Sequence, residues 1–592
     1  MPRPAQFLAM AAMAWLGSAS APSQSLPTAF VNVTVVPMDR DGYLTGHTVV
    51  IRDGRIAEVG PASRVRVPRG TRVIDGRGRY LMPGLVDTHV HVNRASDLLL
   101  YLANGVTTVR NMKGEPKDLV WRERIRAGQM AGPTLLTAGP FIEGVFSAAD
   151  AERIAREQVE SGYDFLKVHG DLSLEAYRRL IAVGGALGVM VVGHLPRNLP
   201  FDSVMAMPQA SIDHAEEYVY TVFGNRVGDT TRLREVARLT RTAGVTVAPT
   251  LVAYEHIARQ LDSLPVLLAQ PEARFLPPIE RLRWRAENNY YSRNIPATAA
   301  RGFRASLRFQ VALVRALHSA GVPLMLGTDA GGPETIVPGF SALHEIELLA
   351  TAGLSPYEAL RTATANPAVA WNAAQEFGTI VSGARADLLL LEADPLRDPT
   401  NVRRRVGVMA RGDWIPEADL TDRLSRIAAK YRTEEGAVDS LRHAGLDAAI
   451  AARQSSWIAG LDRDAQRFVD YQIAEMYRDV LEAGGESALR NAFRRGGSLQ
   501  SLVPPFAQDA MTDLGYRYLW AKRPALASAI LRLVAEAYPA EYGAYAALGE
   551  ALLIEGDSTG ARAALERALT LKPSDGLAQT LMRQLIERRP PQ

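Results

Sequence analysis

The chain of 592 residues carries 67 basic and 64 acidic side chains, and its formal net charge of +3 indicates no strong preference for a polyanion such as nucleic acid. It contains no cysteine, which excludes disulfides, a thiolate nucleophile and thiolate metal ligands. Any bound metal must therefore be held by nitrogen and oxygen atoms, and the length predicts more than one domain.

The first 21 residues are typical of a bacterial export signal. Arg3 precedes an apolar stretch at 7–16 that is too short to span a bilayer, and small residues follow at 19–21. We therefore expect a signal peptide over residues 1–21 and a periplasmic or secreted protein; the alternative is a hydrophobic N-terminus that is retained. No later segment predicts a transmembrane helix.

Two separate segments, 28–80 and 377–415, contain short strand-like runs punctuated by turns. They flank everything that lies between them in the chain. We therefore predict that they pair with each other into one small β-sandwich domain.

Residues 81–376 alternate apolar, strand-like runs with helical stretches, which is typical of a parallel α/β fold. Candidate strands lie near 85, 106, 134, 165, 190, 210, 245 and 322, a number that suits a (β/α)8 TIM barrel. The long segment before the last strand contains Tyr254, Tyr290 and Tyr291. It could form a helical lid or surface packing, and the sequence leaves both open.

The chain after residue 415 is helical in character to its end. We predict a helical linker region over 416–507 and helical repeats over 508–592. A spacing of 34 residues relates Leu514-Gly515 to Leu548-Gly549 and Pro539 to Pro573, which is the tetratricopeptide (TPR) period. Such repeats stack into a concave surface that could bind a partner protein, mediate self-association or only support the enzyme.

Six polar side chains stand at the ends of predicted barrel strands: His89, His91, Lys167, His194, His214 and Asp329. In a parallel barrel the carboxyl ends of the strands meet at one mouth. Four imidazoles, one carboxylate and one amine brought together in this way predict a metal site.

Lys167 is the unusual member of this set, because the chain has only six lysines among its 67 basic residues. It lies between apolar neighbours, where burial favours the neutral amine. A neutral amine can add carbon dioxide to form a carbamate, N6-carboxylysine, which is an anionic ligand with two oxygens. The alternative is a lysine that reaches an acidic partner, but the surrounding histidines favour the ligand.

Several of these residues belong to longer motifs. Residues 82–91, with Asp87-Thr88-His89-Val90-His91, and 327–329 resemble the opening and the last strand of the amidohydrolase superfamily. Residues 191–196, 338–345 and 352–360 resemble its imidazolonepropionase-like branch, which includes Xaa-Pro dipeptidases. The resemblance covers roughly residues 28–415, and Asn111 departs from it, because relatives commonly have an aspartate there.

The resemblance implies two metal ions. His89, His91 and Asp329 would hold the first, His194 and His214 the second, and carboxylated Lys167 would bridge both. Two such ions can share a hydroxide and lower its pKa towards neutrality. That hydroxide would attack an amide carbonyl, while Asp329 acts as general base and then as general acid. Zinc is the expected ion, with manganese or iron as alternatives.

The leading hypothesis is therefore a binuclear metal-dependent hydrolase of amide bonds, with dipeptides or N-acyl amino acids as small-molecule substrates. His169, Tyr254 and His344 are candidates for contacts with the substrate. One rival is an imidazolonepropionase-like hydrolase of a cyclic amide; the resemblance implies one metal and no bridging lysine for it, so Lys167 argues against it. A lactonase is another rival. A hypothesis of a different class is a catalytically silent protein that binds partners through its TPR-like repeats.

Overall fold

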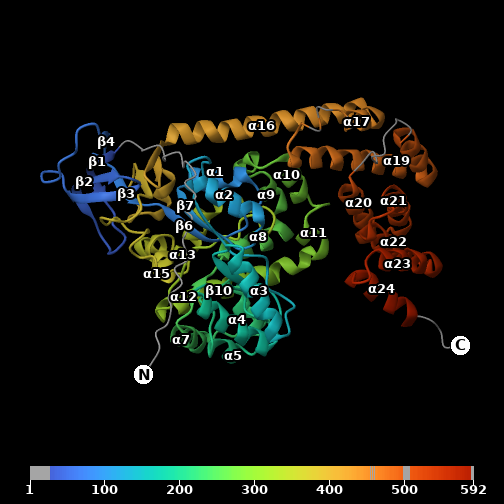
Figure 1. Cartoon of the computed structure of the whole chain (residues 1–592), viewed down its shortest axis with the longest axis horizontal. Helices are drawn as coiled ribbons and strands as arrows, with labels where there is room; N and C mark the ends of the chain where they lie inside the picture. The colour runs from blue at the N-terminus through green and yellow to red at the C-terminus, as the bar shows by residue number, and fades with distance from the viewer. Residues whose placement is uncertain (1–26, 454, 456–457, 459, 498–506, 588–592) are drawn as a thin grey trace, which may run out of the picture.

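The computed structural model describes residues 27–453, 455, 458, 460–497 and 507–587. The predicted signal peptide over residues 1–21 lies outside these residues. A β-sheet, an α/β unit and a helical C-terminal region follow one another along the chain (Figure 1). Within the described residues, none of the helices combines the length and the hydropathy needed to cross a bilayer.

Both flanking segments contribute to one eight-stranded sheet, in the order β15-β14-β13-β5-β1-β2-β3, with β4 also paired to β1. The strands are β1 (Thr28–Val35), β2 (Leu44–Arg52), β3 (Arg55–Pro61), β4 (Arg72–Asp75), β5 (Tyr80–Pro83), β13 (Leu388–Leu391), β14 (Arg405–Ala410) and β15 (Asp413–Pro416). The predicted pairing of the two segments is present, because β5 and β13 run antiparallel with Met82 opposite Leu389. All eight strands belong to one sheet, in which β4 and β5 follow each other along β1. The sheet folds over one apolar core, because Phe30 of β1 packs against Trp414 of β15 with ring centroids 5.2 Å apart.

The α/β unit contains parallel strands in two sheets, ordered β6-β7-β8 and β12-β11-β10-β9. Their bounds are β6 (Leu85–Val90), β7 (Val106–Asn111), β8 (Thr134–Thr137), β9 (Phe165–Val168), β10 (Met190–Gly193), β11 (Ser211–Asp213) and β12 (Thr246–Ala248). A bridge from Ala138 to Phe165 connects β8 directly to β9. On the other side, bridges from Val247 to Leu324 and from Ala330 to Val90 connect β12 to β6 through the segment 322–330. This order of neighbours is the one expected of a (β/α)8 barrel.

The segment 322–330 holds the place of the predicted eighth strand but is not a regular strand. Its backbone donates to different neighbours in turn, from Met325 to Val247 and from Leu326 to Thr362. Asp329 then turns into the left-handed region with φ 59°, which ends any extended run. The segment is therefore extended and hydrogen-bonded on both sides, with paired bridges only near its ends.

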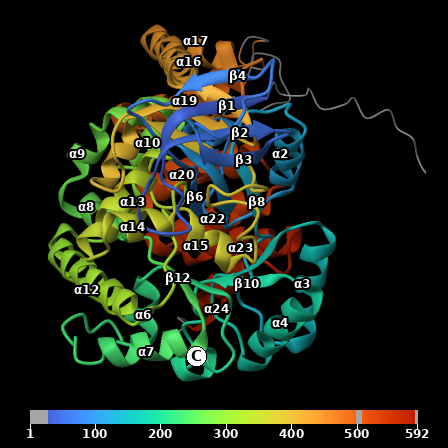
Figure 2. The same cartoon turned by 90° about the vertical axis from the view of Figure 1, so that its left-hand side faces the viewer.

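Helices cover the strands, and several of them surround β10 and β12 in Figure 2. They are α1 (Ala95–Ala103), α2 (Pro116–Arg126), α3 (Ala148–Glu160), α4 (Leu174–Leu187), α5 (Phe201–Met205), α6 (Glu216–Thr221), α7 (Leu233–Ala243), α12 (Ala300–Ser319), α13 (Phe340–Thr351), α14 (Pro356–Thr362) and α15 (Ala365–Ala370). Helix α7 shows why they pack: Leu233, Val236, Ala237 and Thr240 form one buried stripe at helical spacing. These stripes and the strands form one large apolar core.

The long segment before the last strand position is helical. It contains α8 (Leu251–Asp262), α9 (Leu264–Leu268), η1 (Pro271–Phe275), α10 (Pro278–Trp284), α11 (Tyr290–Asn294) and η2 (Ala297–Ala299). We call residues 264–299 the insertion. Ile279 and Leu282 of α10 are buried in the same apolar cluster as the C-terminal helices, so the insertion lies between the α/β unit and those helices.

The C-terminal region is entirely helical in its described residues. It consists of α16 (Glu417–Ala444), α17 (Leu446–Arg453), α19 (Arg463–Gly497), α20 (Gln508–Trp520), α21 (Pro524–Ala537), α22 (Tyr542–Glu555), α23 (Ser558–Leu571) and α24 (Gly576–Glu587). Helices α20, α22 and α24 begin 34 residues apart. A Cβ added at Gly515 or Gly549 would lie 2.6 Å from Leu531 or Leu565, so the same close helix contact recurs one period later.

One arginine connects the α/β unit, the insertion and the C-terminal helices. Arg94 follows β6, and its guanidinium lies 2.8 Å from Glu280 of α10 and 2.5 Å from Asp464 of α19. The three side chains are between 14 and 24% exposed, so these ion pairs are mostly shielded from water. Arg94 thus ties the loop after β6 to the insertion and to the C-terminal helices.

Replacing this arginine should weaken the attachment of the helical region. We expect Arg94→Ala to lower the free energy of unfolding by about 3 kcal/mol, because it leaves two shielded carboxylates without their partner. Arg426→Ala is the matched control, since Arg426 pairs with Asp422 on an exposed surface and should change stability by less than about 1 kcal/mol. Urea unfolding followed by circular dichroism measures both, and equal losses would contradict this role of Arg94.

Candidate metal centre

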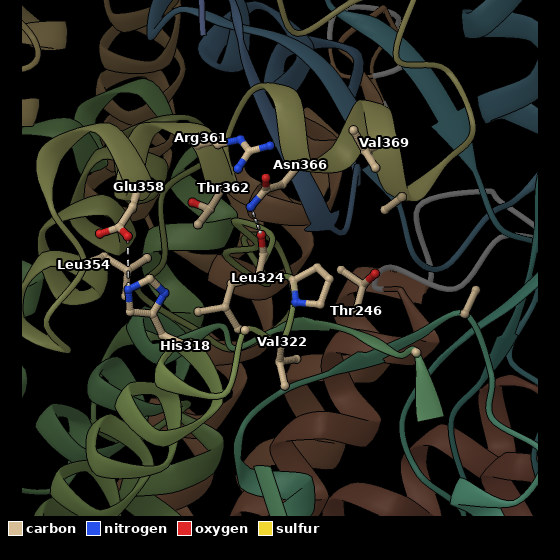
Figure 3. A pocket seen from close by; sticks show the side chains of 15 residues that line it. Thr246, His318, Val322, Leu324, Leu354, Glu358, Arg361, Thr362, Asn366 and Val369 are labelled. Atoms are coloured by element: carbon tan, nitrogen blue, oxygen red, sulfur yellow. Dashed lines mark hydrogen bonds and ion pairs between the residues drawn. The ribbon is translucent and has the colours of Figure 1, made fainter. Parts of the chain in front are cut away.

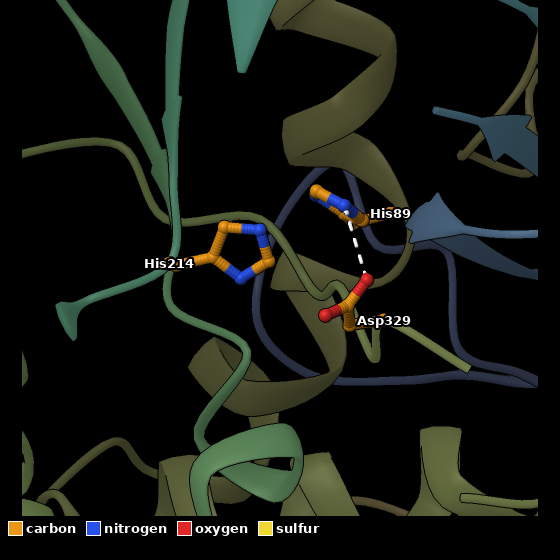
Figure 4. A group of neighbouring side chains, drawn as sticks. All are labelled: His89, His214 and Asp329. Carbon is orange, nitrogen blue, oxygen red and sulfur yellow. Dashed lines mark ion pairs between the residues drawn. The ribbon is translucent and has the colours of Figure 1, made fainter. Parts of the chain in front are cut away.

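The six predicted ligands come from different strand ends and meet at one place. His89 lies within β6, Lys167 within β9, and His194 and His214 directly follow β10 and β11. His89, His214 and Asp329 each offer a ligand atom within 4.8 Å of the others (Figure 4). The remaining members adjoin them, because the ring of His194 lies 4.5 Å from that of His214 and His91 Nε2 lies 2.9 Å from Asp329 Oδ1.

The histidines are oriented by a second set of side chains. Nδ1 of His89 lies 3.2 Å from Asp213, Nδ1 of His194 lies 2.9 Å from Glu217, and Nδ1 of His214 lies 2.7 Å from Thr250. Histidines that bind metals usually donate their other ring N–H to such an acceptor. In this tautomer each Nε2 presents a lone pair, so the three rings are prepared as ligands.

Buried charges support this orientation. The Arg110 guanidinium lies 3.1 Å from Asp213, and both side chains are fully buried. Burial would raise the pKa of Asp213, but Arg110 and His89 outweigh it and hold that pKa well below its usual range. Asp213 therefore stays ionised and remains an acceptor for His89.

Burial keeps the ligand histidines neutral. It lowers the pKa of His91 and moves the pKa values of His194 and His214 well below the usual range. Burial alone would raise the pKa of Asp329. The hydrogen bond and charge of His89 and the contact with His91 outweigh burial and hold this pKa well below its usual value. Neutral imidazoles and an ionised carboxylate are the forms that bind divalent metals.

Lys167 is fully buried, and its Nζ lies 3.2 Å from Nε2 of His89. Within the described residues no carboxylate lies at ion-pair distance from this amine, so the acidic partner considered from the sequence is not formed. Burial lowers the pKa of Lys167 to about 8. Gly193 leaves room for the side chain, since a Cβ there would lie 2.7 Å from Lys167 Cδ and 2.4 Å from Val168 O.

Three non-glycine residues at this mouth have left-handed backbone angles: His214 (φ 75°), Thr250 (φ 49°) and Asp329 (φ 59°). Each such conformation costs on the order of 1–3 kcal/mol and is typical of functional sites. Here it turns the chain at the strand end and directs the side chain towards the centre.

A cavity of about 650 Å³ opens over this centre. Besides five of the six predicted ligands it is lined by Asn93, Lys113, Phe141, His169, Glu216, Ile257, Arg283, Tyr290, Tyr291, Gly331, Gly332, Pro333 and Glu334. His89 lies beneath it and is fully buried. Tyr290, Tyr291 and Arg283 come from the insertion, so the insertion forms part of the cavity wall.

Of the three residues predicted to contact the substrate, His169 lines the cavity and the other two do not. His169 lines the cavity, where its ring stacks on Phe141 at 3.9 Å and its Nδ1 lies 2.6 Å from Glu143. Tyr254 lies outside the cavity lining, because it faces Phe303 in a neighbouring pocket. His344 also lies outside it, held between Glu255 and Glu347.

Sequence reasoning missed the side chains that support the ligands. Asp213, Glu217, Thr250 and Arg110 are buried polar residues whose partners lie far away in the chain. Only Asp213 gave a usable signal, because it is a carboxylate in an apolar run directly before His214. Phe141 gave none, since it lies in an irregular loop.

A second cavity, of about 690 Å³, lies where β12 and the segment 322–330 begin, away from the ligand-bearing ends (Figure 3). Its polar lining includes Arg361, Asn366 and a His318–Glu358 pair at 3.4 Å. It contains a single histidine and one carboxylate among the described lining residues, so its donor set does not resemble a metal centre.

Comparison with known proteins places the whole α/β unit in one family. A model of the Amidohydrolase family matches residues 80–415. An imidazolonepropionase of Ralstonia nicotianae is 26% identical over 400 residues, which cover 62% of this chain and 91% of that protein.

Solved structures show the same fold. A bottromycin amidohydrolase has a TM-score of 0.56 and 24% identity, over 69% of this chain and 92% of its own. A Xaa-Pro dipeptidase with bound methionine in its active site has a TM-score of 0.53 and 18% identity, over 66% of this chain and 100% of its own. Identities of this size establish the fold and leave the substrate open.

The support of His194 by Glu217 can be tested by metal binding. We expect Glu217→Gln to weaken the binding of zinc to metal-free protein roughly 10- to 100-fold, because the acceptor that fixes the His194 ring loses its charge. Glu143→Gln is the control, since its histidine partner, His169, is outside the ligand set. Competition with a chromophoric chelator measures both affinities, and identical values for the two variants would contradict the assignment.

Proposed function

Because the chain belongs to the amidohydrolase family, we propose that it is a metal-dependent hydrolase of amide bonds with two divalent ions held at the barrel mouth. The proposed substrates are dipeptides or N-acyl amino acids. The observation that carries the proposal is Lys167: a buried amine with no acidic partner among the residues that the structure describes, 3.2 Å from the ring of His89. Its carboxylated form would supply the bridging ligand that two ions need.

The residues present fit such ions. The donor set consists of four imidazoles, one aspartate and one lysine in a chain without cysteine, which suits zinc and also manganese or iron. Bound divalent ions supply polarisation of the substrate carbonyl and a lower pKa for water. The rest of the chemistry falls to side chains of the protein.

Asp329 is the proposed proton carrier. Its Oδ1 lies between His89 and His91, at 3.3 and 2.9 Å, which fixes the carboxylate at the floor of the cavity. From there it takes a proton from the attacking water and returns it to the nitrogen of the departing amine. Amide hydrolysis needs this second transfer, because an amine leaves only after protonation.

The walls of the cavity restrict where the substrate lies. The stacked rings of Phe141 and His169 form one flat wall, and Tyr290 and Tyr291 of the insertion also line the cavity. Flat apolar walls favour a substrate with an apolar portion and limit the water around the scissile bond.

A second candidate is hydrolysis of a cyclic amide, favoured by the similarity to an imidazolonepropionase over 400 residues. Lys167 argues against it, since a bridging ligand is superfluous at a centre with one ion. Lactone hydrolysis is the remaining alternative.

The direct test is a substrate screen on metal-reconstituted protein. Dipeptides, N-acyl amino acids, lactones and imidazolonepropionate should be incubated with wild-type protein and with Asp329→Asn. Hydrolysis confined to linear amides and abolished in Asp329→Asn is the expected result. Lactone turnover without amide turnover would overturn the assignment.

The reactivity of Lys167 should depend on pH. With its pKa at about 8, the neutral amine increases as pH rises from 7 to 9, so metal-free protein should gain carbamate over this interval at constant dissolved carbon dioxide. The carbamate carbon can be followed by NMR with ¹³C-labelled bicarbonate, and Lys167→Met should lack the signal. A signal of the same size in Lys167→Met would show that another amine reacts.

A further inference from the structure

Lys113 lies in the loop that follows β7, at the same ends of the strands as the metal centre, and it lines the cavity. The loop is fixed by its neighbours. Asn111 donates from Nδ2 to the carbonyl of Lys113 at 3.3 Å, and the next residue, Gly114, packs so closely that a Cβ would lie 2.0 Å from Ala138 O. These contacts therefore fix the backbone position of Lys113.

The amine of Lys113 lies over the ring of Phe141, 5.1 Å from its centroid. The amine of Lys167 lies 5.7 Å from the same centroid. Phe141 thus links the two lysines, and a molecule bound at the metal centre along this ring comes close to Lys113. The cation–π contact holds the ammonium group at the wall of the cavity.

This ammonium group is not neutralised by the protein. Within the described residues no carboxylate pairs with Lys113, whereas Lys117 in the same region pairs with Glu115 at 2.9 Å. Arg283, which also lines the cavity, lies 3.6 Å from Glu280. Lys113 therefore has free donors that face the space where a substrate would lie.

Carboxylates that line the cavity do not compete strongly for these donors. Asp329 is engaged by His89 and His91. The carboxylate of Glu216 accepts a hydrogen bond from the side chain of Tyr220. Burial raises the pKa of Glu334.

We propose that Lys113 binds a carboxylate of the substrate, on the amino-acid side of the scissile amide. This inference rests on the proposed function and specifies its substrate class as amides of amino acids with a free α-carboxylate. In such molecules the carboxylate carbon is three bonds from the scissile carbonyl carbon, roughly 3–4 Å away, which places it along the Phe141 ring towards Lys113. An ammonium–carboxylate hydrogen bond then discriminates the free acid from its neutral amide.

Kinetics on a matched substrate pair test this role. An N-acyl amino acid and its C-terminal carboxamide should be compared with wild type, Lys113→Met, Lys113→Arg and the control Lys117→Met. In wild type the free acid should have the higher kcat/KM, and Lys113→Met should reduce the ratio of acid to amide roughly 10- to 100-fold, chiefly through KM. Lys113→Arg should retain most of the ratio, and Lys117→Met all of it.

A binding measurement separates this inference from the proposed function. The N-alkyl amino acid, which has a methylene group in place of the scissile carbonyl, is not hydrolysed, and calorimetry on metal-reconstituted protein reports its affinity directly. Weaker binding to Lys113→Met than to Lys117→Met supports the carboxylate contact even where no amide is cleaved. An unchanged acid-to-amide ratio in Lys113→Met, or a loss that occurs only in Arg283→Met, overturns it.

Discussion

The burial of one amine among imidazoles is the constraint on which the rest of the structure depends. An unpaired ammonium group is costly in an apolar interior, and the side chain of Lys167 is fully buried with a histidine ring as its near neighbour. Burial lowers the pKa of Lys167, which favours the neutral amine. The proposed carbamate would turn this amine into an anion that attracts two metal ions. Gly193 and the strand pairing around β9 make the space in which this group lies.

The same constraint explains the buried charges behind the ligands. A ring such as His89 serves as a ligand only when its other nitrogen has an acceptor, and Asp213 provides it. Asp213 in turn stays ionised because Arg110 lies beside it in the core. The fully buried Arg110–Asp213 pair is thus better understood as part of the metal centre than as a source of stability, since such pairs often contribute little to stability by themselves.

The sequence predicted which six side chains lie together because one rule decides it: side chains at the carboxyl ends of parallel strands meet. The supporting residues could not be predicted, because contacts such as His214 with Thr250 depend on how neighbouring loops turn. Tyr254 and His344 were misplaced for the same reason, since helix α8 and helix α13 direct them into other pockets. The order of the strands in the flanking sheet could not be predicted, because β1 accepts β4 and β5 on one edge, a choice that alternation of apolar residues does not encode.

The insertion connects the cavity over the metal centre to the C-terminal helices. Tyr290 and Tyr291 line the cavity, while Arg293 of the same helix stacks on Trp520 of α20. The helix that carries these two tyrosines is therefore in contact with the C-terminal helices outside the α/β unit. The central claim is the pair of ions bridged by Lys167, and the metal content of purified protein tests it most directly. Elemental analysis should find two ions per chain in wild type and a loss of both, together with activity, in Lys167→Ala. One ion per chain in wild type, with an active Lys167→Ala variant, would contradict the account.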